Sequence, residues 1–269
     1  MTETTFKTYP NIAQSFGICG ISIVGFLLFI PVYFLLKNVI GAEGARFFYY
    51  IFASGIPLLL AHFIRKRKTV SSTFNFAINK KIILFLVIAT LALLFGIISP
   101  ISSLIPMSES AKRRLLEFGS QTGPLAFVMM VIAAPVFEEL IFRGIILDGL
   151  LKKYTPLKSI TVSSLMFGLV HLNPWQFVTG FTNGVFSGSV YFKTRSVFAC
   201  IIIHIAANLA GFSMKYLVDD LQSLDQSMLD FYGGWINLTL VVVGSALVIL
   251  ACLWFLKREF LRESSTAQA

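Results

Sequence analysis

The chain has 269 residues, of which 56% are hydrophobic and only 13% are charged, and its mean hydropathy is +0.80. Soluble domains carry about 25% charged residues, so this composition excludes an ordinary soluble domain and predicts an all-α, polytopic bundle of transmembrane helices. The net charge of +9 does not indicate nucleic-acid binding, because the basic residues occupy short connections between apolar segments. We expect one membrane domain over residues 1–269.

A membrane-spanning helix needs about 20 mostly apolar residues. The polar start MTETTFKTYPNIAQSFG is unlike a signal peptide, and the apolar run that follows is too long for one, so we expect it to stay attached as the first span. The fifth and sixth spans are short and leave only a tight turn at Asn173-Pro174 between them. We predict eight spans, with seven as the alternative count: Phe16–Leu36, Phe47–Ile64, Ile82–Leu104, Pro124–Leu150, Leu157–Leu172, Phe177–Phe192, Val197–Leu217 and Trp235–Leu256.

The distribution of Lys and Arg predicts the orientation. With the N-terminus inside, 15 of the 22 basic residues fall on the inner side and 6 on the outer side, while Arg143 lies within a span. Because cytoplasmic loops are enriched in Lys and Arg, we expect both termini to be cytoplasmic, in a membrane that is prokaryotic given the short loops. The outer six are Lys37, Arg46, Lys112, Arg113, Arg114 and Lys215, the last followed by Asp219, Asp220, Asp225 and Asp230.

Three of these outer basic residues lie in the segment from Pro106 to Ser120. Its apolar and charged positions predict a short helix, which either lies flat in the membrane interface or forms a solvated loop helix. Cys19, Cys200 and Cys252 are scattered through apolar runs without a CxxC pair, so neither a disulfide framework nor a thiolate metal site is predicted.

The fourth span carries charges that a membrane helix normally excludes. Glu138, Glu139 and Arg143 occur in the sequence EELIFRG, and each charge at the middle of a span costs about 2.5–3.5 kcal/mol on insertion scales. Glu139 and Arg143 have the i,i+4 spacing of an ion pair, whereas Glu138 is rotated about 100° away. An unpaired carboxylate of this kind suits a general base. The alternative is an ion-pair cluster that only locks helices together.

Further polar groups are predicted at the same depth. His171 ends the fifth span, and His204 and Asn208 lie one turn apart on the seventh. At about 1.5 Å per residue, Glu138, His171 and Asn208 each lie roughly 20 Å from the basic residues at the inner ends of their spans. His62, beside RKRK, is interpreted as an interfacial residue instead. Gly180, Gly184 and Gly188 repeat a spacing that lets helix backbones approach closely.

These residue types predict hydrolysis without a covalent intermediate. Glu138 and His171 can polarise a water for attack on a carbonyl, and His204 and Asn208 can donate hydrogen bonds to the developing oxyanion. No cofactor is preferred. Zinc bound by Glu138, His171 and His204 is the alternative, since two histidines and a carboxylate are a known catalytic ligand set, but it leaves Asn208 without a role.

The motifs EELIFRG, FGLVH and HIAAN resemble the EExxxR, FxxxH and HxxxN motifs of the CAAX-protease and bacteriocin-processing family, whose best-known members are type II CAAX prenyl endopeptidases. The resemblance covers residues 125–211, the expected protease core, and no motif position departs from the pattern. It implies a water-activating Glu138 assisted by His171, an oxyanion-stabilising pair of His204 and Asn208, and supporting roles for Glu139 and Arg143. The family has been described both as metalloproteases and as metal-free glutamate proteases, and Asn208 favours the latter.

We therefore predict an intramembrane endopeptidase that acts on a membrane-associated or lipidated peptide or protein. Two alternatives remain at this point: a proton-coupled transporter, and a non-catalytic membrane scaffold or immunity protein of the same fold. The lack of a clear inverted repeat argues against the transporter. The sequence predicts neither the oligomeric state nor the cleavage motif.

Overall fold

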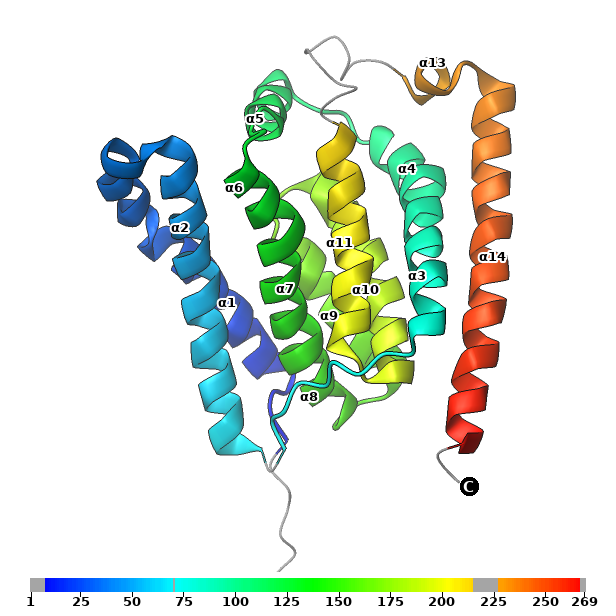
Figure 1. The fold of residues 1–269 in the computed structure, drawn as a ribbon, viewed down its shortest axis with the longest axis horizontal. Coiled ribbons are helices and arrows are strands. Elements are labelled where there is room, and N and C mark those ends of the chain that lie inside the picture. Colours follow the sequence, from blue (N-terminus) through cyan, green and yellow to red (C-terminus); the bar gives the residue numbers. More distant parts are fainter. Residues whose placement is uncertain (1–7, 70, 215–226, 267–269) are drawn as a thin grey trace, which may run out of the picture.

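The computed structural model describes residues 8–69, 71–214 and 227–266, and these residues form a bundle of helices that run side by side (Figure 1). The predicted all-α membrane fold is confirmed. Lys7, Lys215, Asp219, Asp220, Asp225 and the end of the seventh predicted span lie outside the described residues. The helices are α1 Ile12–Leu28, α2 Ile30–Lys68, α3 Lys80–Leu93 continued by η1 Leu94–Ile98 and α4 Ser99–Ser103, α5 Glu109–Gly119, α9 Pro156–Leu169, α10 Pro174–Thr194, α11 Val197–Met214, α13 Met228–Tyr232 and α14 Trp235–Thr266.

The fourth predicted span is one long helix of five consecutive parts. These parts are α6 Pro124–Phe127, η2 Val128–Ala133, α7 Ala134–Glu139, η3 Leu140–Leu147 and α8 Asp148–Leu151, and η2 and η3 have π-helical geometry. Such widened turns occur often at functional sites. Here η3 begins directly after Glu139, and η2 ends about one helical turn before Glu138.

Five helical stretches are long and apolar enough to cross a membrane: Ile12–Lys68, Lys80–Ser103, Pro124–Leu151, Val197–Met214 and Trp235–Arg262. They contain six of the eight predicted spans, because the first stretch holds two. The fifth and sixth predicted spans are helices α9 and α10, which do not meet these criteria. α9 has only 14 residues, and α10 carries several polar side chains. In the projection of Figure 1, α9 appears between α7 and α11, and α10 appears between α11 and α3.

The first predicted span, Phe16–Leu36, was wrong as one continuous helix. α1 ends at Leu28 and α2 begins at Ile30, with Pro31 in its first turn. Proline has no N–H to donate and its ring clashes with the preceding turn, so it is tolerated at a helix start and breaks a helix interior. A second break inside α2 falls at Gly41, whose φ of 77° is accessible mainly to glycine. Figure 1 shows α1 and α2 as a pair at one edge of the bundle.

Close packing joins α9 to α10, as the glycine spacing predicted. Asn173 begins α10 by accepting hydrogen bonds from the backbone N–H groups of Trp175 and Gln176, which fixes the short turn between the two helices. A Cβ atom on Gly180 would lie 3.2 Å from the Cα of Gly168, and one on Gly184 would lie 2.9 Å from the Cβ of Ser164. The small residues therefore let the two backbones approach closely.

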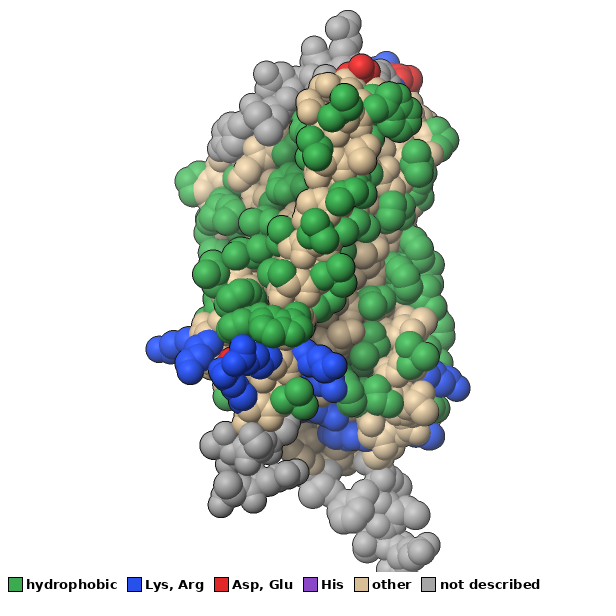
Figure 2. All heavy atoms as spheres, turned by 90° about the vertical axis from the view of Figure 1, so that its right-hand side faces the viewer, with side chains coloured by type: hydrophobic (Ala, Val, Ile, Leu, Met, Phe, Trp, Pro, Cys, Tyr) green, Lys and Arg blue, Asp and Glu red, His purple; other side chains and the backbone are tan. Residues whose placement is uncertain are grey.

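The two ends of the bundle differ in charge. The described part of the C-terminal helix ends at the same end as the loop that joins α2 to α3 (Figure 1), and Lys and Arg side chains gather near that end on the face seen in Figure 2. Lys80, Lys81, Lys257 and Arg258 are among the exposed residues there. The amphipathic helix expected between Pro106 and Ser120 is present as α5 at the opposite end. Cytoplasmic termini and an interfacial α5 stay predictions.

We expect Gly184→Ala to lower the melting temperature in detergent. The added methyl group would overpack the contact with α9 at a cost of about 1–3 kcal/mol, more than the helix-propensity gain of about 1 kcal/mol. Gly211→Ala is the matched control, because a Cβ there meets nothing within 4 Å. Differential scanning fluorimetry checks the pair, and equal melting temperatures for the two variants would contradict the proposed close contact.

Candidate active site

A buried ion pair lies at the centre of the site. The Nη1 atom of Arg143 donates to Oε1 of Glu139 at 2.9 Å, and the two side chains are 2% and 1% exposed. The other guanidinium nitrogen, Nη2, donates to the carbonyl of Gly184 at 3.5 Å, and the guanidinium carbon lies 4.5 Å from the centre of the Phe167 ring. The i,i+4 pair predicted from the sequence is therefore present, and α9 and α10 enclose its cation.

Glu139 connects three helices through its two oxygens. Besides Arg143, Oε1 accepts a hydrogen bond from Nδ1 of His204 at 2.9 Å, and Oε2 accepts one from the hydroxyl of Ser187 at 3.4 Å. His204 belongs to α11 and Ser187 to α10. A carboxylate that accepts several hydrogen bonds holds its donors in fixed orientations. Glu139 thus positions the His204 ring.

Both intramembrane histidines are held through Nδ1. The Nδ1 atom of His171 lies 2.8 Å from the carbonyl oxygen of Phe167. The Nδ1 atom of His204 lies 2.9 Å from Oε1 of Glu139. Carbonyl and ionised carboxylate oxygens only accept, so both Nδ1 atoms carry the proton and both Nε2 atoms are left available. The Phe167 ring meets both imidazoles edge to face, at centroid distances of 5.2 Å and 5.6 Å.

Asn208 fills a gap in the backbone hydrogen bonds of the fourth span. Ala134 donates to the carbonyl of Met129, and Pro135, the next residue along, has no N–H for the carbonyl of Met130. The side-chain Nδ2 of Asn208 donates to that carbonyl at 2.8 Å. This contact ties α11 to η2 and still leaves the second N–H of the amide available, since an asparagine amide has two.

Glu138 faces a different side from Glu139. Its Oε1 accepts a hydrogen bond from the hydroxyl of Tyr50 on α2 at 3.3 Å. Its Oε2 has no hydrogen-bond partner among the described residues and lies 3.9 Å from Nε2 of His204. The side chain is 27% exposed. The rotation predicted from helix geometry is confirmed, and Glu138 retains a free oxygen next to His204.

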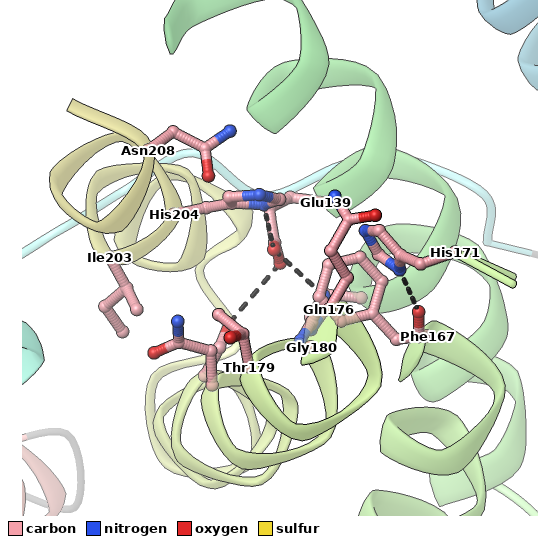
Figure 3. A pocket seen from close by; sticks show the side chains of 12 residues that line it. Glu139, Phe167, His171, Gln176, Thr179, Gly180, Ile203, His204 and Asn208 are labelled. Carbon is pink, nitrogen blue, oxygen red and sulfur yellow. Dashed lines mark hydrogen bonds and ion pairs between the residues drawn. The ribbon is translucent and has the colours of Figure 1, made fainter. Parts of the chain in front are cut away.

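A pocket of about 130 Å³ opens beside this network (Figure 3). Five of the six predicted site residues line it: Glu139, Arg143, His171, His204 and Asn208. Glu138, predicted as the central catalytic residue, is the exception: it is not among the lining residues, although it lies next to His204. His62 also lies apart from the pocket, with its ring stacked on Phe74 at 4.9 Å.

The sequence analysis missed one wall of the pocket. α10 supplies the side chains of Gln176, Thr179, Asn183 and Ser187, and Oδ1 of the buried Asn183 has no hydrogen-bond partner among the described residues. Their spacing of three and four residues places them on one face of the helix. A polar stripe of this kind within a predicted span is the signal that would have found them.

A single metal ion does not fit the arrangement of ligands. Histidines that bind metals typically have the second ring nitrogen engaged, as both rings do here. However, no three His, Cys, Asp or Glu side chains in the described part of the chain are grouped so that they could hold one ion. The zinc ligands considered from the sequence, Glu138, His171 and His204, are therefore not grouped around a single point.

The comparisons with known proteins concern the segment that carries the site. Residues 120–210 match the family described as "Type II CAAX prenyl endopeptidase Rce1-like". The chain is also 30% identical over 88 residues to a Bacillus subtilis (strain 168) protein named "Putative membrane peptidase YdiL", an alignment that covers 33% of this chain and 36% of the relative. No solved structure matches the chain. The family resemblance predicted from the three motifs is confirmed, and all three lie within the matched segment.

We expect Arg143→Leu to destabilise the protein strongly. The substitution would leave the Glu139 carboxylate buried without its cation, which costs about 3–5 kcal/mol. Adding Glu139→Gln should restore much of the loss, because glutamine keeps an acceptor for His204 without the charge. Melting temperatures of the two single variants and the double variant in one detergent form the measurement. A double variant less stable than Arg143→Leu would contradict the ion-pair account.

Proposed function

We propose that the chain is an intramembrane endopeptidase that hydrolyses a peptide bond of a membrane-associated or lipidated peptide or protein. One observation carries the proposal: the buried Glu139–Arg143 pair fixes His204 beside a second glutamate, Glu138, that has a free oxygen. A network that only joined helices would have no use for that free carboxylate oxygen within 3.9 Å of an available ring nitrogen. The family match over residues 120–210 supports the same reading.

Glu138 is the proposed general base. A water held by its free Oε2 and by Nε2 of His171 attacks the carbonyl carbon of the scissile bond and gives up a proton to Glu138. The new C–O bond produces a tetrahedral oxyanion, and the C–N bond then breaks as the same proton passes to the leaving amine. No covalent enzyme intermediate is needed.

The oxyanion is the proposed ligand of His204 and Asn208. The second amide N–H of Asn208 can donate to it, because the first is held on Met130. Nε2 of His204 must carry a proton in order to donate, so the role requires both ring nitrogens to be protonated in the reacting complex. The carboxylates of Glu139 and Glu138 lie at the two nitrogens, 2.9 Å and 3.9 Å away. Donors held in place before the reaction lower the barrier most.

The substrate class follows from where the pocket lies. Its residues come from helices within the apolar bundle, so a substrate must reach it from the membrane or from the membrane surface. The α10 wall offers the side chains of Gln176, Thr179 and Asn183, which suit the amide groups of an extended peptide. The matched family is named for prenyl endopeptidases. For this chain we propose the broader class of membrane-associated or lipidated substrates.

We expect Glu138→Gln to abolish cleavage and leave the melting temperature close to that of the wild type. Glutamine retains an acceptor for Tyr50 but takes no proton from water, and the loss of a general base costs about 10²–10⁴-fold in rate. Glu117→Gln, an exposed position on α5, is the matched control. Mass-spectrometric mapping of cuts in a library of lipidated and apolar peptides, with enzyme in nanodiscs, gives the readout. Equal cleavage by Glu138→Gln and the wild type would refute the general-base role.

Metal independence is a separate prediction. Because the reaction is proposed to use Glu138, both histidines and Asn208 without an ion, purified active enzyme should contain far less than one equivalent of zinc. Its cleavage rate should also survive prolonged dialysis against a chelator. Elemental analysis and the peptide assay check both points. Stoichiometric zinc that is lost together with activity, and that restores activity on return, would contradict the metal-free mechanism.

A further inference from the structure

Three polar contacts hold α2 against the helix that carries the two glutamates. Near one end, the Glu43 carboxylate accepts a hydrogen bond from the backbone N–H of Ala126 at 3.0 Å. Near the other end, Arg65 donates to Asp148 at 2.8 Å, and both side chains are largely buried. Tyr50 makes the third contact, between them, with Glu138. Contacts at both ends fix the position of α2 along this helix and thereby place the Tyr50 hydroxyl.

The Tyr50 hydroxyl has two polar neighbours, the Ser54 hydroxyl one turn along α2 and the Glu138 carboxylate. Its ring lies among aromatic neighbours, 5.8 Å from the centre of the Phe26 ring and 6.4 Å from that of Phe137. A buried tyrosine hydroxyl needs a hydrogen-bond partner, and that of Tyr50 donates to Oε1 of Glu138 at 3.3 Å. The neighbouring Tyr49 also donates through its hydroxyl, but to the carbonyl of Phe26 at 2.8 Å.

This contact makes the two oxygens of Glu138 unequal: one is hydrogen-bonded and the other is not. Oε1 is engaged by Tyr50, whereas Oε2 is without a partner among the described residues and lies on the side of His204. A carboxylate that is held at one oxygen cannot turn freely about its terminal bond. The contact therefore directs the free oxygen toward the site.

We propose that Tyr50 is a positioning residue for Glu138, which extends the site to α2, a helix outside the matched segment. The proposal rests on the general-base role proposed for Glu138 above. Tyr50 does not line the pocket and is assigned no contact with substrate. Its hydroxyl holds one oxygen of the carboxylate, so that the other oxygen faces His204.

Tyr50→Phe tests this proposal, with Tyr49→Phe as the matched control on the same helix. The probe is a fluorogenic peptide built on a cut mapped with the wild-type enzyme in nanodiscs. Tyr50→Phe should lower kcat by about 10- to 100-fold, the range for a hydrogen bond to a charged group. Its KM should change by less than about twofold, because an interaction that acts only on the chemical step leaves substrate binding unchanged. Tyr49→Phe should keep both constants near those of the wild type.

A second readout needs no turnover. Dicyclohexylcarbodiimide is apolar and labels carboxyl groups within membranes, so the rate at which it labels Glu138, mapped by mass spectrometry, reports whether that carboxyl group is held by its hydrogen bond. Loss of the Tyr50 hydroxyl should raise that rate about tenfold or more, and loss of the Tyr49 hydroxyl should not. Glu138→Gln identifies the labelled position.

The two readouts separate failure of this inference from failure of the proposed function. If Tyr50→Phe matches Tyr49→Phe in kcat and in labelling, the positioning role is overturned even though the wild type cleaves peptides. If the wild type cleaves nothing, the proposed function fails, and labelling of Glu138 still decides whether Tyr50 controls that carboxylate. A parallel rise in KM, with unchanged labelling, would also overturn the inference, since it would indicate a general loss of structure.

Discussion

The need to neutralise Arg143 inside an apolar bundle is the constraint on which the rest of the site depends. The Arg143 guanidinium carries five N–H donors and is only 2% exposed, so the protein must supply most of its partners. Glu139 provides the opposite charge, the Gly184 carbonyl an acceptor, and the Phe167 ring a face for the cation. Phe167 belongs to α9 and Gly184 to α10, and Glu139 binds His204 of α11. These contacts bring α9, α10 and α11 together around Arg143.

α10 shows how this requirement shapes a whole helix. One face of α10 carries Gly180, Gly184 and Gly188, which have no side chains, so α9 can approach to backbone contact distance. Close approach brings the Gly184 carbonyl to Arg143 and Ser187 to Glu139. A helix built of small and polar residues is too polar to be stable facing lipid. It is stable here because its polar side chains face inward, as Asn183 and Ser187 do: both line the pocket and are 8% and 1% exposed.

Irregular backbone provides a second source of polar contacts. Pro135 and the π-helical turn before it leave the Met130 carbonyl without an intrahelical partner, and Asn208 supplies one from α11. The break at Phe29 and the kink at Gly41 turn the first helical stretch back on itself, so that α2 runs beside the helix that carries Glu138 and Glu139. In both places a local departure from the regular helix produces a long-range contact, and both contacts lead to the site.

The sequence by itself determined the features that depend on neighbouring residues. Apolar runs located the helices, i,i+4 spacing gave the Glu139–Arg143 pair and the rotation of Glu138, and three motifs gave the family resemblance. Only the tertiary structure decided how these parts meet. It placed Glu139 rather than Glu138 in the lining of the pocket, turned the polar stripe of α10 toward it, and brought Tyr50 to a residue 88 positions away. Helical periodicity fixes which residues share a face. It does not fix which face of which other helix they meet, because that depends on the packing of side chains and backbones from the whole bundle at once.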